Sequence, residues 1–252
     1  MMACSLLLVA CGRSDLVVEP TEMVAGKTYA QYVPTWWQWA YTQPAKNHPL
    51  VYSEGGDFCG TGQPSGEVFF LGPTFGGEAK RPCTVPAGKT LLFPIAVSEQ
   101  NNFPMDPIQR NNTQLEAAAR RSIDSAKLLR VELDGKGLIG GDVAAFSRFR
   151  QKAQFSFTVP DVPDNLLRGA LGIDYAGTIS VAFTDGYWLM LKPLPPGEAG
   201  LLRIQSDSNA DGYFNDPEAT AAVLRDGWFY TGDLATQDEV GNIFIKGTKC
   251  KR

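Results

Sequence analysis

The stretch from residue 28 to 42 carries aromatic and aliphatic residues at the three- and four-residue spacing of an amphipathic helix. This spacing predicts a helix with one buried face. Pro34 fits a helix only in its first turn, because it lacks the backbone N–H that later turns require. The regular part of this helix is therefore expected to start near Val33.

A second helix is predicted between residues 113 and 127. Thr113 and Glu116 have the T-x-x-E spacing of a capping box, and Leu115 begins an apolar stripe that continues at helical spacing. The stripe indicates that this helix packs one side against the rest of the domain.

Short apolar or alternating runs bounded by Gly, Pro or Asp-Gly predict strands and turns. These runs lie at residues 67–71, 90–93, 128–133, 155–159, 178–183 and 187–191. Asp185 and Gly186 are expected to form the turn between the last two strands. The many short strands predict a β-rich α+β fold, a β-sandwich or jelly-roll-like domain with two helices packed on it.

The composition is typical of a folded chain, and it has no excess of basic side chains that would attract a polyanion. The 252 residues are 44% hydrophobic and include 23 basic and 27 acidic side chains, a formal charge of −4. This excludes a mostly disordered chain and allows one or two domains. No basic face is implied, so nucleic acid is not expected as a partner. The single histidine, His48, excludes a multi-histidine metal site, and we predict no metal site.

The N-terminus has an apolar run, Cys4 to Ala10, with the length of a signal-peptide core. Leu8 to Cys11 (LVAC) resembles the lipobox of bacterial lipoproteins, which are cut before the cysteine that carries the lipid. The resemblance implies lipid attachment at Cys11, a membrane partner reached through that anchor, and export to the periplasm or cell surface. The alternative is a short apolar N-terminus of a cytosolic protein. The expected divisions are a signal peptide at 1–10, a tether at 11–26, an exported β-rich domain at 27–197 and a C-terminal segment at 198–252.

Cys59 and Cys83 both lie in turns rich in Gly or Pro. Two loop cysteines this close readily form a disulfide in an oxidising compartment. Closing a loop of about 25 residues would contribute roughly 3–4 kcal/mol. The alternative is two free thiols.

Trp36, Trp37 and Trp39 are candidates for stacking on an unknown ligand such as a sugar. Aromatic residues at helical spacing more often belong to a core, and that is the favoured interpretation of these three.

Three carboxylates near turns, Asp57, Glu99 and Asp185, are candidates for an acid–base pair of the kind that hydrolyses glycosides. Turn-forming or hydrated carboxylates are the favoured interpretation, because no spacing brings the three together. His48 is a weak candidate for a catalytic triad, since no G-x-S-x-G motif supplies a nucleophile. A group of polar residues could supply oxygen ligands for calcium: Asn101, Asn102, Asp106, Asn111 and Asn112. Their spacing is not that of an EF-hand, so we favour the interpretation that they are ordinary polar loop residues.

The body of the chain contains several distinctive motifs, among them Trp36-Trp37-Gln38-Trp39, Cys59-Gly60-Thr61-Gly62-Gln63 and Asp185-Gly186-Tyr187-Trp188. On these motifs, residues 26–197 resemble a group of uncharacterised secreted bacterial proteins. The resemblance implies export and a shared fold, and it attaches no activity.

The pattern changes after Pro196. Three blocks follow, DGYFNDPEAT at 211–220, DGWFYTGDL at 226–234 and DEVGNIFIKG at 238–247. With these blocks, residues 197–247 resemble a fragment of the adenylate-forming superfamily, the acyl-CoA synthetases and AMP-binding enzymes. The resemblance implies a short αβ segment in which Asp233 binds the ribose hydroxyls of ATP. The strand at 228–230 is expected to pair with the strand at 243–245.

The segment departs from that family in two respects. No Ser/Thr/Gly-rich phosphate loop ending in Lys stands upstream, and Thr248 occupies the place of the family's arginine. Without a phosphate cradle, ATP is not positioned for adenylation. We therefore interpret the whole chain as an exported, lipid-anchored bacterial protein of unknown activity, more suited to binding or structure than to catalysis, with no catalytic residue and no cofactor. The alternative is an acyl-CoA synthetase-like enzyme using ATP and CoA, or its inactive remnant, joined to the exported domain as a chimera near Pro195.

Overall fold

The computed structural model describes residues 13–51, 58–74, 83–86, 88–133 and 136–193, and the backbone of strands between 199 and 248. The helical elements are η1 (Arg13–Leu16), α1 (Tyr29–Thr42), α2 (Asn112–Asp124), α3 (Val143–Phe146), η2 (Ser147–Phe149) and α4 (Leu166–Ala170). The strands are β1 (Val68–Phe70), β2 (Thr90–Asn101), β3 (Leu129–Leu133), β4 (Lys136–Gly137), β5 (Arg150–Val159), β6 (Gly177–Leu191), β7 (Ala199–Gly200), β8 (Leu202–Ser206), β9 (Leu224–Arg225), β10 (Trp228–Tyr230), β11 (Asp233–Gln237) and β12 (Ile243–Thr248).

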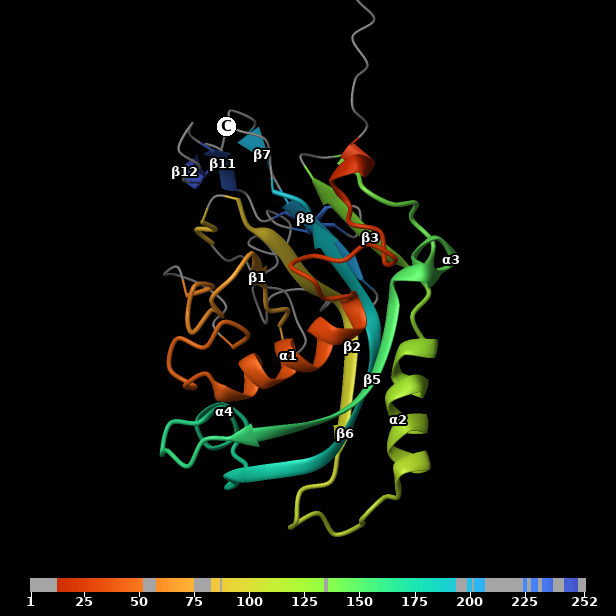
Figure 1. The fold of residues 1–252 in the computed structure, drawn as a ribbon, viewed down its shortest axis with the longest axis vertical. Helices are drawn as coiled ribbons and strands as arrows, with labels where there is room; N and C mark the ends of the chain where they lie inside the picture. Colours follow the sequence, from red (N-terminus) through yellow and green to blue (C-terminus); the bar gives the residue numbers. More distant parts are fainter. Residues whose placement is uncertain are drawn as a thin grey trace, which may run out of the picture.

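The centre of the fold is a sheet with strand order β1-β2-β6-β5, which curls into a half-barrel (Figure 1). β1 runs parallel to β2, whereas β6 is antiparallel to both β2 and β5. Helix α1 packs on the concave face, chiefly against β5, and α2 packs on the other face against β6 and β2. The β-rich α+β prediction is confirmed in this coarse form. The predicted β-sandwich is not confirmed, because in the described part of the chain α1 and α2 pack on the two faces of this sheet.

Helix α1 begins at Tyr29 and contains Pro34, so the predicted start near Val33 is wrong. The Thr28 N–H donates to the Gln31 side chain at 2.9 Å and caps the first turn. Pro34 removes one backbone hydrogen bond from the helix. Burial of the aromatic face more than offsets that loss, since each buried aromatic side chain contributes about 2 kcal/mol.

Helix α2 begins at Asn112, and its cap is Asn111 rather than Thr113. The Asn111 side chain accepts from the Gln114 N–H at 2.9 Å, and the Gln114 side chain accepts from the Asn111 N–H at 2.9 Å. The predicted box of Thr113 and Glu116 is therefore corrected by two residues, because asparagine caps a helix at least as well as threonine. No helix in the described part of the chain is long and apolar enough to cross a membrane.

Strand β6 is continuous where the sequence predicts two strands and a turn. Gly186 lies opposite Val97 of β2. A Cβ at Gly186 would lie 2.7 Å from the Ala96 carbonyl oxygen, so the glycine permits a close approach of the two strands. The Asp-Gly pair misled the prediction because turns and close backbone contacts both select glycine.

Part of the predicted tether, residues 11–26, packs on the domain. Val18 donates its N–H to the Met190 carbonyl at 3.0 Å and accepts from the Tyr29 hydroxyl at 2.7 Å. Val17 forms a bridge with Leu191, and both valines are buried. The predicted signal peptide and Cys11 lie outside the described residues.

Strands after residue 198 extend a second sheet, with order β4-β3-β8-β10-β9, and form a third, with order β12-β11-β7. β8 pairs antiparallel with β3 along Leu129–Leu133, so backbone of the C-terminal segment hydrogen-bonds to the body. β10 pairs with β8 and β9, while β12 pairs with β11. The predicted pairing of 228–230 with 243–245 is therefore wrong, because β11 supplies the antiparallel partner nearest in sequence to β12.

Cys59 and Cys83 are joined by a disulfide, with their Cα atoms 5.5 Å apart. Cys59 packs with Phe69 and Val85 in a small apolar cluster beside β1. The bridge therefore holds two loops against the edge of the central sheet, as the sequence predicts for this pair.

Candidate functional site

The three tryptophans of α1 belong to the core. Trp36, Trp37 and Trp39 are 0%, 7% and 5% exposed. Their indole N–H groups donate to the Leu71 carbonyl, the Thr184 hydroxyl and the Thr61 carbonyl, respectively. The Trp36 ring lies edge to face with the rings of Trp37, Trp39 and Trp188. Buried rings with occupied N–H groups offer no open face to a ligand in this arrangement.

His48 is buried, and its two ring nitrogens are used within the fold. The Leu50 N–H donates to Nδ1 at 3.0 Å, and Nε2 lies 2.9 Å from the Ala40 carbonyl oxygen at the end of α1. This requires the neutral tautomer with the proton on Nε2. The ring therefore fixes the loop after α1, and the described residues form no catalytic triad through it.

The carboxylates singled out in the sequence do not converge. Glu99 of β2 lies opposite Thr184 of β6, and Ser98 lies opposite Asp185. Because successive side chains of a strand point to opposite faces, Glu99 faces α1 and Asp185 faces α2. An acid–base pair of these two residues is therefore excluded, and Asp57 lies outside the described residues.

Among the described carboxylates, Glu99 stands out because its hydrogen-bond partners are neutral side chains. The Tyr41 hydroxyl donates to its Oε2 at 2.9 Å, and the Asn101 Nδ2 lies 3.1 Å from both carboxylate oxygens. These partners are neutral, and within the described part of the chain no lysine or arginine lies at ion-pair distance from Glu99. A partly buried carboxylate is thus held by hydrogen bonds, with no positive charge at ion-pair distance among the described residues.

Burial raises the pKa of Glu99 to about 7, against hydrogen bonds from Asn101 and Tyr41 and the more distant charge of Arg110, which act to lower it. Burial and then the charge of Glu99 raise the pKa of the Tyr41 hydroxyl well above its usual value. Near neutral pH, Glu99 therefore exchanges a proton while Tyr41 keeps its own. A carboxyl group that titrates near pH 7 suits proton transfer or binding of a cation.

Asn101 adds an unmet acceptor to this site. Its side chain is 8% exposed, and its amide oxygen Oδ1 has no hydrogen-bond donor. Thr184 cannot serve, because its hydroxyl donates to the Ser98 carbonyl at 2.9 Å and accepts from Trp37. We name Tyr41, Glu99 and Asn101 the concave-face site.

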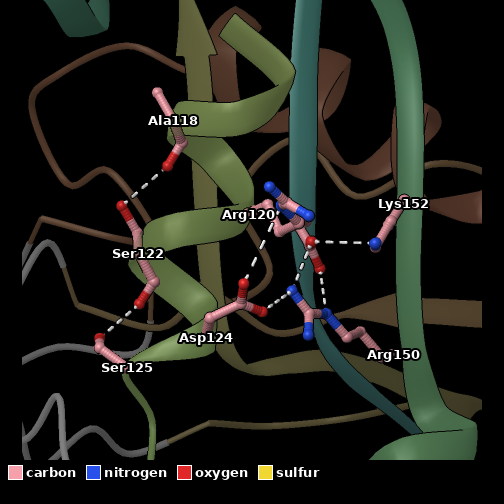
Figure 2. A network of polar contacts seen from close by, with 8 residues as sticks. Ala118, Arg120, Ser122, Asp124, Ser125, Arg150 and Lys152 are labelled. Atoms are coloured by element: carbon pink, nitrogen blue, oxygen red, sulfur yellow. Dashed lines mark hydrogen bonds and ion pairs between the residues drawn. The ribbon is translucent and has the colours of Figure 1, made fainter. Parts of the chain in front are cut away.

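The opposite face of the sheet holds a compensated network of charges (Figure 2). Arg150 of β5 donates from Nε and Nη2 to the two oxygens of Asp185, each at 2.7 Å. The same guanidinium reaches Asp124 of α2 at 2.7 Å, and Lys152 lies 3.7 Å from Asp185. Asp185 is 2% exposed, so this bidentate pair neutralises a buried charge and ties α2 to the sheet.

The pKa shifts in this network follow from the same contacts. Hydrogen bonding to Asp185 raises the pKa of Arg150. Hydrogen bonding from Arg150 lowers the pKa of Asp124. Arg150 and Asp124 therefore keep their charges at neutral pH. A cavity of about 300 Å³ beside the network is lined by Glu116, Arg120, Lys152, Phe183 and Asp185, among others.

The suspected calcium cluster is part of the loop and helix framework. Asn102 exchanges hydrogen bonds with the Arg110 backbone, and Asp106 accepts from the Phe103 N–H. Asn111 caps α2. Among the described residues, no three His, Cys, Asp or Glu side chains gather as they would around a metal ion.

Sequence reasoning named Glu99 without finding its partners. Tyr41 was not singled out, and Asn101 was considered only as a conceivable calcium ligand or a polar loop residue. Asn101 stands two positions after Glu99 in a strand, which places both on one face, and this spacing is a signal that was available. Tyr41 is contributed by a helix 58 positions away, and only tertiary packing brings it there.

Comparison with known proteins finds no family model that matches the chain. The chain is 45% identical over 85 residues to a medium/long-chain-fatty-acid–[acyl-carrier-protein] ligase, FadD10, of Mycobacterium tuberculosis, covering 31% of this chain and 15% of the ligase. It is 52% identical over 54 residues to a feruloyl-CoA synthase of Amycolatopsis, covering 21% and 11%. A long-chain-fatty-acid–CoA ligase of Bacillus subtilis is 35% identical over 81 residues, covering 32% and 14%. The chain thus spans less than a sixth of these ligases.

Among solved structures, the amide bond synthetase McbA of Marinactinospora thermotolerans is 40% identical over 23% of this chain and 12% of its own. The TM-score of that match is 0.16, a value too low to bear on the fold.

These similarities correct the main functional interpretation of the sequence. An exported, lipid-anchored protein more suited to binding or structure than to catalysis is not what the relatives indicate, because they are named as ligases. They support the alternative, a segment similar to adenylate-forming enzymes. The resemblance of 26–197 to secreted proteins, the lipid at Cys11 and the export of the chain stay predictions.

Proposed function

We propose that residues 197–247 are the part of this chain shared with acyl-CoA ligases, and that their function is to bind the nucleotide of an adenylate-forming reaction. The observation that carries this proposal is the 52% identity over 54 residues, a length close to that of the segment. The three blocks at 211–220, 226–234 and 238–247 are the motifs on which the resemblance rests.

The proposed contact is between Asp233 and the ribose of ATP or AMP. Asp233 is the first residue of β11, and its backbone pairs with Thr248 of β12. A carboxylate has two oxygens that can accept from two neighbouring hydroxyl groups, and such charge-assisted hydrogen bonds are short and strong. The diol of ribose presents two donors at a matching spacing, which makes it a suitable ligand for a single aspartate.

For this chain we propose only a class of reaction, which we take from the names of its relatives. Their names describe ligases that join fatty or aromatic acids to coenzyme A or to a carrier protein. The corresponding substrates here would be ATP, a carboxylic acid and a thiol acceptor. Because the sequence lacks a phosphate loop of the family type, we assign to this segment the ribose end of the nucleotide and no catalytic residue.

The test is calorimetric titration of the full chain with AMP. We expect saturable binding that weakens at least tenfold in Asp233→Asn, because one hydrogen bond to a charged group contributes about 1.5 kcal/mol or more. Asp238→Asn serves as the matched control, since it makes the same change within the same segment. Absence of AMP binding by the unaltered chain, or equal loss in both variants, would overturn the proposal.

A further inference from the structure

We propose that the concave-face site, Tyr41, Glu99 and Asn101, binds a primary ammonium group of a small organic cation. The site is separate from residues 197–247, so this inference does not depend on the proposed nucleotide function. It rests on two independent features, an uncompensated carboxylate and a buried acceptor with no donor.

The first feature is the carboxylate of Glu99. Three contacts at 2.9–3.1 Å come from the neutral donors Tyr41 and Asn101, and they leave the negative charge uncancelled. On the other face of the same sheet, the Asp185 carboxylate receives a bidentate guanidinium. Buried carboxylates are normally paired with a cation. The described part of the fold places no such cation beside Glu99, so a ligand could supply it.

The second feature is the Oδ1 atom of Asn101. The residue is 8% exposed and its oxygen has no donor, although its Nδ2 touches both oxygens of Glu99. One amide group carries both atoms, so Oδ1 is at most one amide width farther from the carboxylate than Nδ2. A buried acceptor without a donor is unfavourable because it has lost its hydrogen bond to water, and a ligand that supplies a donor restores such a bond.

These two acceptor groups select the chemistry of the ligand. A primary ammonium carries a positive charge and three N–H donors that point in different directions. One head group can therefore reach Glu99 and Asn101 together. A hydroxyl has a single donor and no charge, and a quaternary ammonium has the charge but no donor. The ring of Tyr41, stacked on Phe157 at 3.9 Å, adds aromatic surface near the site.

Binding is coupled to a proton at Glu99. The charged or titratable groups that act on Glu99 are Tyr41 from α1 and Arg110 from the segment before α2, and β6 contributes the neutral Thr184. An ammonium ion prefers the ionised carboxylate. With a pKa of about 7, Glu99 is about one-tenth ionised at pH 6 and about nine-tenths at pH 8, so the affinity is expected to rise about tenfold over that interval.

The experiment is calorimetric titration of the full chain with n-butylammonium at pH 6, 7 and 8, with 1-butanol and tetramethylammonium as comparison ligands. We expect n-butylammonium alone to bind, with the tenfold rise in affinity and with release of about half a proton per bound ligand at pH 7. Equal binding of 1-butanol or of tetramethylammonium, an affinity independent of pH, or no binding at all would overturn the proposal.

Two substitutions locate the site. Glu99→Gln keeps the shape and removes the charge, and we expect it to abolish binding of n-butylammonium. Glu116→Gln makes the same change at an exposed position of α2 and is expected to leave binding unchanged. Tryptophan fluorescence and urea unfolding verify that both variants are folded. Undiminished binding by folded Glu99→Gln would also overturn the proposal.

Discussion

The two faces of the central sheet each hold a carboxylate, but one carboxylate has a charged partner and the other has neutral partners. On the face covered by α2, Asp185 is deeply buried and is matched by two hydrogen bonds from Arg150 at 2.7 Å. On the concave face covered by α1, Glu99 is partly buried and is held by the neutral groups of Tyr41 and Asn101. The two residues belong to adjacent strands and lie almost opposite each other in the register.

The difference shows how a fold separates structural charges from responsive ones. The buried Asp185 carboxylate receives its opposite charge from the bidentate Arg150 guanidinium, and the pair links strand β5 to strand β6. A carboxylate desolvated beside neutral donors instead has its pKa raised toward neutrality. The Glu99 carboxylate therefore changes its charge near physiological pH, and this is why we place the candidate binding site on the concave face.

The largest expected effect comes from Arg150→Met. This variant leaves Asp185 buried, with the partly exposed Lys152 at 3.7 Å as its remaining cation. Breaking one side of a buried ion pair costs about 3–5 kcal/mol. Urea unfolding at pH 7 measures the loss of unfolding free energy.

The control for that variant is Lys152→Met on the same strand. Its side chain is 52% exposed, so its contribution is expected to be at most about 1 kcal/mol. If both variants were destabilised equally, the contrast between a structural pair and an exposed neighbour would be wrong.

The next effect is a pH dependence set by Glu99. Its folded pKa of about 7 lies above the ordinary glutamate value of 4.5, so the folded state binds this proton more tightly than the unfolded state. The contribution to stability is present below pH 4.5 and is lost as the pH rises through 7. Between pH 5 and pH 8 the loss amounts to roughly 2–3 kcal/mol.

We expect Glu99→Gln to remove that slope, so that its unfolding free energy relative to the unaltered chain increases from pH 5 to pH 8. Urea unfolding at each pH gives the comparison, with Glu116→Gln as the matched control. A slope that survives in Glu99→Gln would assign the titration to another group and remove the basis of the contrast between the two faces.

The smallest effect is a shift in the pKa of Glu99 in Tyr41→Phe. The variant removes a donor 2.9 Å from the carboxylate, and this hydrogen bond lowers the pKa. The pKa of Glu99 is therefore expected to rise further, by about one unit, for a hydrogen bond to a charged group worth about 1.5 kcal/mol. Carbon-13 NMR titration of the glutamate carboxyl carbons measures it.

Tyr175→Phe is the control for that experiment, because the Tyr175 hydroxyl donates to the Thr178 carbonyl and not to Glu99. An unchanged pKa of Glu99 in Tyr41→Phe, or an equal shift in both variants, would show that the Tyr41 hydroxyl does not set the protonation of the site.

Local rules predicted the parts of the fold that depend on local pattern. The aromatic spacing of 28–42 predicted α1, and the apolar run at 67–71 predicted β1. The same rules failed at Gly186, where the glycine accommodates the backbone of β2 rather than a turn. A sequence pattern records that a residue is small, and it does not record which contact requires the small residue.

The sequence by itself predicted α1 and α2, parts of the strands of the central sheet, the disulfide between Cys59 and Cys83 and the motifs shared with ligases. These features depend on periodicity, on composition and on residues that are close along the chain. Only the tertiary structure decided that Glu99 and Asp185 lie on opposite faces, and which partners each receives. Those partners come from elements far away in sequence, and whether a carboxylate meets a guanidinium or a hydroxyl is fixed when helices and strands pack.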